Sequence, residues 1–371
     1  MACLRRTPVG GQNDIPWNII GNQRAVNAVA RAQASDSPPH AYLFVGPERV
    51  GKATLALRLA QALNCERTAP SVHLPSSSSL LPSSPDPAPC LQCTACTRIA
   101  NGIHADVQVI TIQPNAEGDQ KTGIAVEQVR EIEAGASLNP YEGRTRVYIL
   151  DPADQLTVEA QNAFLKTLEE PPPHVVLILI ATREERLLPT IHSRCRRVEF
   201  RLMPSPDIEA ALAAEGHDSE NAALLARLAR GRAGWALSMA RDPAAIERRR
   251  EVLQGAHAVP RMSVAERMRL AEKLLDDFRA NRDAVYTVLA EWAGWWRDVM
   301  LVQSGAEDGI ANLDLLDELR EDASVHSREE VLAFVRAIIA ARDHLRANVQ
   351  ARPALELLVL EAPALSSKIT L

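Results

Sequence analysis

The hydrophobic positions follow two different patterns along the chain. In the N-terminal half, short runs of consecutive apolar residues alternate with segments of helical spacing. An apolar run of four to six residues is typical of a strand buried on both faces of a parallel sheet. The alternation predicts an α/β domain with a parallel sheet over residues 15–203. The strands that we expect are Ala41–Val45, Asp106–Ile110, Arg146–Leu150, Val175–Ile180 and Arg197–Phe200.

After Pro204-Ser205-Pro206, almost every apolar residue has helical spacing. We expect a small helical lid over residues 204–245 and an all-helical domain over residues 246–371. Residues 1–14 are expected to be a disordered lead. Trp292, Trp295 and Trp296 recur at helical spacing. They could form a ligand platform, but aromatic residues with this spacing usually lie in a core or a subunit interface, and we expect the same here.

The strand Ala41–Val45 runs into Gly46-Pro47-Glu48-Arg49-Val50-Gly51-Lys52 and then into a helix. Gly46, Gly51 and Lys52 have the spacing of a phosphate-binding P-loop, and the strand–loop–helix context fits; a plain strand–loop–helix turn is the alternative. Ala53 stands where a Ser or Thr would ligate Mg²⁺, and Thr54 is turned about 100° further around the helix. The sequence predicts a degenerate nucleotide site in which ATP binding is disfavoured.

Two further positions of this candidate site follow strands. Asp151 could help to hold Mg²⁺, as an acidic residue does in ATPases of this kind, or could simply cap a turn. Pro152 stands where an active ATPase usually has Glu, and it has no carboxylate with which to orient water. Thr182 could sense a γ-phosphate or could be an ordinary loop residue. We therefore do not expect the chain to hydrolyse ATP.

Other motifs indicate a family. Ile20-Gly21-Asn22-Gln23, His40–Phe44, Gln161–Pro172 and Ser193-Arg194-Cys195 all occur in order. Together with the phosphate loop they resemble the clamp-loader branch of the AAA+ proteins, clearly over about residues 15–240 and more weakly beyond. The resemblance implies an AAA+ P-loop domain with an inserted zinc module, followed by the helical lid and an all-α collar domain.

The resemblance also assigns a role to Arg194. In that family the Ser-Arg-Cys arginine reaches the ATP of the adjacent subunit, and a planar, permanently charged guanidinium suits this task. Arg194 would be such a trans arginine finger, framed by Ser193 and by Cys195, which we expect to be buried beside it. The alternative is that Arg194 belongs to a solvated basic cluster with the arginines at 186, 196 and 197. Arg232 lies near the family's second sensor position, where the match is loose.

The function implied by the resemblance is that of a non-hydrolysing clamp-loader subunit of DNA polymerase III, a DNA-directed DNA polymerase (nucleotidyltransferase) holoenzyme. Its partners would be clamp-loader ATPase subunits and a delta subunit in a hetero-pentamer, with the sliding clamp and primed DNA reached through the complex. Two alternatives remain: an autonomous AAA+ ATPase motor that uses Lys52 and Asp151, and a zinc-dependent DNA-binding module.

Four cysteines are candidate metal ligands: Cys65, Cys90, Cys93 and Cys96. Four thiolates at such spacing suit a closed structural Zn²⁺ site over residues 65–96, and an iron–sulfur cluster is the alternative. Disulfides are disfavoured because the N-terminus lacks the apolar core of a secretory signal. The resemblance also places a zinc module here. The Pro- and Ser-rich residues 66–89 are expected to form a flexible loop.

Charge narrows the function classes. The net charge is −6 and the isoelectric point is about 5.9, which opposes a large autonomous DNA-binding surface. The chain has no apolar run long enough to span a membrane. With no secretory signal either, we expect a cytoplasmic protein.

Overall fold

The computed structural model describes residues 17–68, 88–113, 123–242, 244–346 and 350–364. The expected disordered lead and most of the expected flexible loop therefore lie outside the described residues. The chain divides into two compact units, Met1–Ala211 with Gly231–Trp235, and Leu212–Arg230 with Ala236–Leu371. Two helices, α7 (Ser205–Ala214) and α9 (Ala233–Ala240), contribute residues to both units.

The first unit is built on a five-stranded sheet in the order β2-β3-β4-β1-β5, and every pair of neighbours is parallel. The prediction of a parallel α/β sheet is confirmed. Strands β1 and β3 have the expected bounds, β2 and β4 differ by one residue at one end, and β5 is shifted by one residue at both ends. The strands are β1 (Ala41–Val45), β2 (Val107–Ile110), β3 (Arg146–Leu150), β4 (Val175–Ala181) and β5 (Arg196–Glu199).

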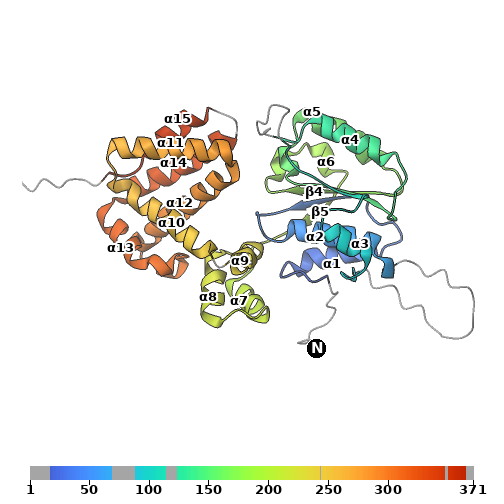
Figure 1. Ribbon diagram of the computed structural model, residues 1–371, viewed down its shortest axis with the longest axis horizontal. Helices are drawn as coiled ribbons and strands as arrows, with labels where there is room; N and C mark the ends of the chain where they lie inside the picture. Colours follow the sequence, from blue (N-terminus) through green and yellow to red (C-terminus); the bar gives the residue numbers. More distant parts are fainter. Residues whose placement is uncertain (1–16, 69–87, 114–122, 243, 347–349, 365–371) are drawn as a thin grey trace, which may run out of the picture. The chain divides into compact units, whose positions relative to one another are not determined.

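Helices cover both faces of this sheet (Figure 1). Alternate residues of a strand point to opposite faces. Tyr42 and Phe44 of β1 therefore pack with α1, α2 and α3, while Leu43 packs with α4, α5 and α6. This is why β1 and β4 are apolar and buried at every position. The six helices are α1 (Gln23–Gln33), α2 (Lys52–Asn64), α3 (Thr94–Ala100), α4 (Val126–Ala136), α5 (Val158–Glu169) and α6 (Pro189–His192).

The second unit is helical throughout the part that the structure describes. Its long helices start at well-formed caps: Ser263 and Glu266 exchange hydrogen bonds at the start of α11, and the Asn281 side chain caps α12. Beside parts of α7 and α9, its α-helices are α8 (Ser219–Leu228), α10 (Ala245–Ala258), α11 (Val264–Ala280), α12 (Arg282–Gln303), α13 (Leu316–Val325), α14 (Arg328–Arg346) and α15 (Ala351–Leu360).

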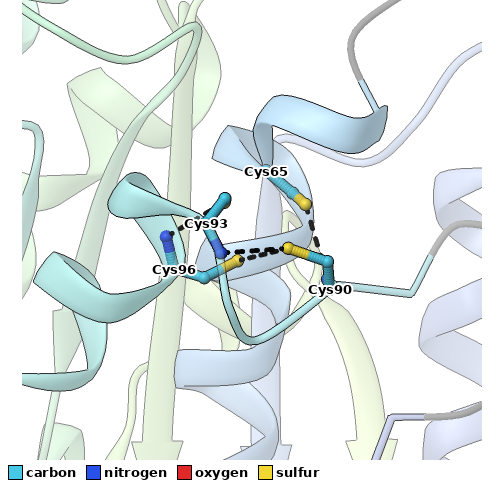
Figure 2. A group of neighbouring side chains, drawn as sticks. All are labelled: Cys65, Cys90, Cys93 and Cys96. Carbon is cyan, nitrogen blue, oxygen red and sulfur yellow. Dashed lines mark hydrogen bonds between the residues drawn. The ribbon is translucent and has the colours of Figure 1, made fainter.

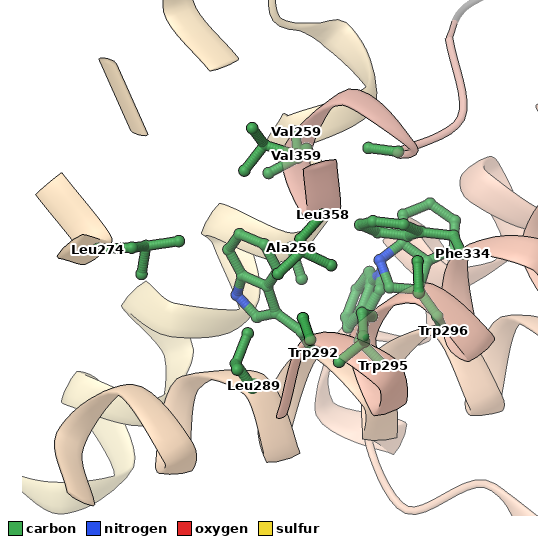
Figure 3. Packing of buried hydrophobic residues seen from close by; sticks show 14 of the residues in the cluster. Ala256, Val259, Leu274, Leu289, Trp292, Trp295, Trp296, Phe334, Leu358 and Val359 are labelled. Carbon is green, nitrogen blue, oxygen red and sulfur yellow. The ribbon is translucent and has the colours of Figure 1, made fainter. Parts of the chain in front are cut away.

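The three tryptophans of α12 lie in the core of the helical unit (Figure 3). Trp292, Trp295 and Trp296 are each no more than 2% exposed. Trp296 packs edge-on against Phe334 of α14, with ring centroids 5.4 Å apart. The expectation that these rings form core and not a ligand platform is confirmed.

A buried arginine ties the end of the chain to this core. The Arg267 side chain of α11 donates to the carbonyl oxygens of Val359, Ala362, Pro260 and Pro363. The last four carbonyl groups of a helix have no intrahelical partner, and Arg267 satisfies one of them in α15, that of Val359, together with two carbonyls just after the helix. Burial lowers the pKa of Arg267. This cation has a structural role.

Candidate functional site

The β1–α2 loop, residues 46–51, leads from β1 into α2, whose first residue is Lys52. Gly46 and Gly51 have φ angles of 143° and 101°, which L-residues with a side chain rarely adopt. A Cβ at Gly46 would also lie 2.3 Å from the Phe200 carbonyl oxygen. Glycine is therefore required at position 46, both by the backbone angle and by the close approach of the segment after β5.

Donors from the chain itself hold the carbonyl groups of this loop. Gly234 N, within the first unit, donates to Arg49 O at 2.9 Å, and Asn22 Nδ2 donates to Val50 O at 3.1 Å. Lys52 Nζ donates to Gly46 O and, at 3.0 Å, to Pro47 O. The loop is fixed from three sides without any ligand.

Lys52 is drawn into the protein. Its ammonium also donates to Ala181 O at 3.0 Å and to Thr182 Oγ1 at 3.3 Å, at the end of β4. Only 6% of the residue is exposed. Burial lowers the pKa of Lys52, and the nearby carboxylates of Asp151, Asp154 and Glu48 act against this shift. The structure thus brings together Lys52 and Thr182, two of the residues that the sequence predicted to meet.

Carboxylates outnumber cations at this site. Burial raises the pKa of Asp151; Lys52 opposes the shift, and Asp154 and Glu48 add to it. Asp154 is buried, and its two oxygens accept the backbone N–H groups of Thr182 (3.4 Å) and Arg183 (3.2 Å). The sequence analysis missed Asp154 and Glu48. The available signals were an acidic residue within the Gly-rich loop and another three positions after Asp151.

The structure also shows where the residues lie that depart from the ATPase pattern. Ala53 and Thr54 are both exposed on the first turn of α2, whereas Lys52 beside them is buried. Pro152 follows Asp151 at the end of β3 and offers no side-chain oxygen. The described part of this site therefore supplies one ammonium and several carboxylates, but no hydroxyl adjoining Lys52 in the sequence and no acid next to Asp151.

Arg194 lies apart from Lys52, just after α6 and before β5. Its Nη1 donates to Thr190 O (2.9 Å) and to Ser193 Oγ (3.2 Å), and its Nη2 donates to Glu169 Oε1 (2.5 Å). About a third of its side chain, 31%, is exposed. A guanidinium has five N–H groups. Two of them donate to nothing among the residues that the structure describes.

The neighbouring arginines differ from Arg194. Arg197 forms two hydrogen bonds with Glu184 and lies 3.7 Å from Glu199, so its charge is neutralised locally. Hydrogen bonding to Glu184 raises the pKa of Arg197. Cys195 is partly buried and packs at the margin of the α4–α6 core, so the predicted burial is found only in part. Burial raises the pKa of this thiol to about 12.

The four predicted cysteines meet at one point (Figure 2). The sulfur atoms of Cys65, Cys90, Cys93 and Cys96 all lie within 4.8 Å of one another. Backbone N–H groups of residues 90, 93 and 96 point at Cys65, Cys90 and Cys93 sulfur respectively, at 3.3–3.5 Å. Burial opposes ionisation of Cys90, but hydrogen bonds from backbone amides and neighbouring thiols lower its pKa to about 6. Such a cluster could hold one metal ion.

Polar side chains of α2 and of the segment just before β3 hold the backbone around this cysteine cluster. Gln61 donates to Cys96 O at 2.8 Å, and Arg144 donates to Cys65 O at 3.0 Å. Asn64 Oδ1 accepts the backbone N–H groups of Arg144 and Thr145. Sequence analysis did not single out these residues, because isolated polar positions at the end of a helix carry no spacing signal.

Comparisons with known proteins bear on the whole chain. A family model described as "DNA polymerase III, delta subunit" matches residues 21–204. DNA polymerase III subunit delta′ of Bacillus subtilis (strain 168) is 26% identical over 354 residues, covering 93% of this chain and 98% of that protein. DNA polymerase III subunit tau of the same organism is 33% identical over 191 residues, covering 52% of this chain but only 30% of that longer relative.

A solved DNA polymerase III gamma subunit-related protein from Thermotoga maritima is 14% identical and aligns with a TM-score of 0.40, covering 91% of this chain and 98% of that one. This likeness is too weak to carry a structural argument. In the described part of the chain, none of the helices combines the length and apolarity that a membrane crossing needs. The family match and the near full-length relative agree with the motifs at 161–172 and 193–195, and the chain belongs to the delta-prime family of DNA polymerase III, as a clamp-loader-type subunit in DNA replication.

Proposed function

We propose that this chain is a non-hydrolysing clamp-loader subunit that supplies Arg194 to the ATP of a neighbouring ATPase subunit. One observation carries the proposal: Lys52 spends its donors on its own chain, whereas Arg194 lies at the surface with two N–H groups unused among the described residues. The first cation is committed to the fold, and the second is available to a partner.

Electrostatics argue against ATP turnover at the β1–α2 loop. Glu48, Asp151 and Asp154 act together on Lys52, and a triphosphate brought there would add further negative charge. Mg²⁺ would normally offset this charge, but Ala53 cannot ligate it and Pro152 cannot orient the attacking water. The site is thus a degenerate nucleotide site whose present role is to hold the strand ends together. Its residues are Gly46, Gly51, Lys52, Thr54, Asp151 and Thr182.

The chemistry of Arg194 suits action in trans. In phosphoryl transfer, negative charge spreads over the phosphate oxygens, and a guanidinium donates to two of them at once. Ser193 and Cys195 flank the arginine: Ser193 accepts one of its hydrogen bonds, and Cys195 closes the margin of the core behind it. The neighbour would supply the nucleotide and Mg²⁺.

Within the complex we assign the three segments that follow residues 1–14 as the sequence predicted: an AAA+ P-loop domain over 15–203, a lid over 204–245 and a collar over 246–371 that joins a ring of five subunits. The partners would be ATPase subunits of the gamma/tau kind and a delta subunit. The assembled complex would open a sliding clamp and load it onto primed DNA. Support comes from the similarity to subunits whose names place them in DNA polymerase III.

The test is the ATPase rate of the reconstituted complex with Arg194→Ala. Loss of a trans arginine is expected to lower the DNA-stimulated rate on the order of 10³-fold, with assembly unchanged. Arg196→Ala is the matched control, because Arg196 is an exposed arginine two residues further along and should leave the rate within about twofold. An unchanged rate with Arg194→Ala would refute the proposal.

We also propose that the ion held by Cys65, Cys90, Cys93 and Cys96 is a structural Zn²⁺. A tetrahedral ion with Zn–S bonds of about 2.3 Å requires sulfur atoms roughly 4 Å apart. The observed limit of 4.8 Å fits a single ion. Thiolates around an iron–sulfur cluster must stand further apart, because the iron atoms lie between them. When bound, the ion would cross-link the end of α2 to α3.

Elemental analysis of the purified chain tests the metal. One zinc per chain is expected, and Cys96→Ser should abolish it. Cys195→Ser is the control and should retain the full metal content, because Cys195 lies outside the cluster. Iron, or four reactive thiols with no metal, would contradict the assignment.

A further inference from the structure

Arg194 forms an ion pair within its own chain that no sequence pattern predicted. Its Nη2 lies 2.5 Å from Oε1 of Glu169, the last residue of α5, which is 25 positions earlier. Its Nη1 is fixed by Thr190 O and Ser193 Oγ. The guanidinium is thus held at two of its corners by two separate elements.

Hydrogen bonds join α5 to the segment that leads into α6 and the Arg194 turn. Gln161, buried in α5, donates to Arg186 O at 3.2 Å and accepts the N–H of Leu188 at 2.8 Å, just before α6. His40, just before β1, pairs with Leu168 O next to Glu169 at 3.1 Å. Glu169 therefore sits at a fixed distance from the turn that carries Arg194, and the C-terminal end of α5 adds negative potential toward the cation.

We infer that Glu169 is a positioning residue for Arg194, which holds the guanidinium in the geometry that a neighbouring phosphate requires. This inference rests on the proposed trans role of Arg194. Arginine otherwise loses much rotational freedom when it engages a phosphate, and prior alignment removes part of that cost.

The pair aligns Arg194 without withholding it. Glu169 is 51% exposed, and ion pairs at such a surface are weak and readily screened. A triphosphate with its higher charge would compete easily for the N–H groups. The carboxylate accepts at only one corner of the fork, so the N–H groups without partners among the described residues remain available for bidentate contact.

The experiment is a double-mutant cycle on the ATPase rate of the reconstituted complex. Glu169→Gln keeps the shape of the side chain but removes its charge, so we expect kcat to fall roughly tenfold with the KM for ATP nearly unchanged. In the Arg194→Ala background, Glu169→Gln should have no further effect, because the residue acts through Arg194. Glu170→Gln, at the adjacent exposed glutamate, is the control and should leave kcat unchanged.

The outcomes separate the two proposals. If Arg194→Ala leaves the rate unchanged, the trans role fails and this inference fails with it. If Arg194→Ala lowers the rate but Glu169→Gln does not, the positioning role alone is refuted. A higher rate with Glu169→Gln would show that the pair sequesters Arg194, and a further loss in the Arg194→Ala background would show that Glu169 acts by another route; either result also overturns the inference.

Discussion

Lys52 and Arg194 are two cations on the same α/β unit, one at the start of α2 and the other just after α6, with different surroundings. The Lys52 ammonium is buried, donates to three backbone carbonyls and one hydroxyl, and faces several carboxylates. The Arg194 guanidinium is a third exposed, meets one carboxylate, and keeps N–H groups unused among the described residues. The two cations differ in the use of their N–H donors: those of Lys52 bond to its own chain, and some of those of Arg194 have no acceptor among the described residues.

Under the proposed function, Lys52 stabilises its own chain and Arg194 acts on a neighbouring subunit. A P-loop lysine serves chemistry only if a phosphate replaces its internal acceptors. Here Asn22, Gly234 and Lys52 itself donate to loop carbonyls, and Lys52 would have to leave its acceptors to contact a phosphate. If Arg194 acts on the ATP of a neighbour as proposed, Ala53 and Pro152 need not support hydrolysis in this chain.

Arg194→Lys should lower the rate less than Arg194→Ala does, and it tests whether the planar guanidinium is needed. Lysine keeps the charge but replaces the planar fork with a single point donor. We expect the complex's ATPase rate to fall on the order of 10²-fold, measured at saturating ATP with DNA present. A rate close to that of the unmodified complex would mean that charge alone suffices.

Arg267→Ala tests the contrast between a cation that stabilises its own chain, Arg267, and one that we propose acts on a neighbouring subunit, Arg194. The substitution leaves four buried carbonyls without their donor, so the helical unit should lose about 3 kcal/mol of unfolding free energy in urea titration. Arg279→Ala on the same helix, at a 69% exposed arginine, should cost less than about 0.5 kcal/mol. Equal effects would show that the carbonyl contacts of Arg267 contribute little.

Lys52→Ala should affect stability and not turnover. Its loss leaves carbonyls of the β1–α2 loop and of β4 without a donor, at a cost of about 2 kcal/mol in unfolding free energy. The complex's ATPase rate should stay within about twofold of the unmodified rate. In a working P-loop the same change would remove phosphate binding, so a large drop in rate would break the comparison.

Asp151→Asn should give the smallest effect, and its sign depends on pH. Burial raises the pKa of Asp151 above its ordinary value of 3.8, so the folded chain holds this proton more tightly than the unfolded chain. The stability that protonation provides is full below about pH 3.8 and is lost as pH rises through the higher folded pKa. At pH 7 the asparagine variant should therefore melt at a slightly higher temperature, with the gain shrinking toward pH 4. A lower melting temperature at pH 7 would argue that the pairing with Lys52 outweighs burial.

Local patterns were enough to predict the parallel sheet, because β1 and β4 are apolar at every position and β3 is apolar after its first residue, Arg146. The cysteine cluster was predictable for a similar reason, since three cysteines at a spacing of three residues need only one remote partner. The strand order β2-β3-β4-β1-β5 was not, because side-chain patterns do not say which strands are neighbours.

The polar details of the candidate site depend on tertiary contacts that have no periodic signal. Glu169 meets Arg194 across 25 positions, and Asn22 meets the β1–α2 loop across 28. Cys195 is only partly buried, and a single residue in a turn has no pattern that predicts its exposure. Asp154 was missed because its contacts with Thr182 and Arg183 join segments 28 and 29 positions apart.

The most direct test of the central claim is ATP turnover by the purified chain with Mg²⁺, run beside the reconstituted complex containing either the unmodified chain or Arg194→Ala. The account predicts no turnover above background by the chain alone, a normal rate for the unmodified complex and a loss on the order of 10³-fold with Arg194→Ala. Mg²⁺-dependent turnover by the chain alone that Lys52→Ala abolishes would contradict the account and make this subunit a motor.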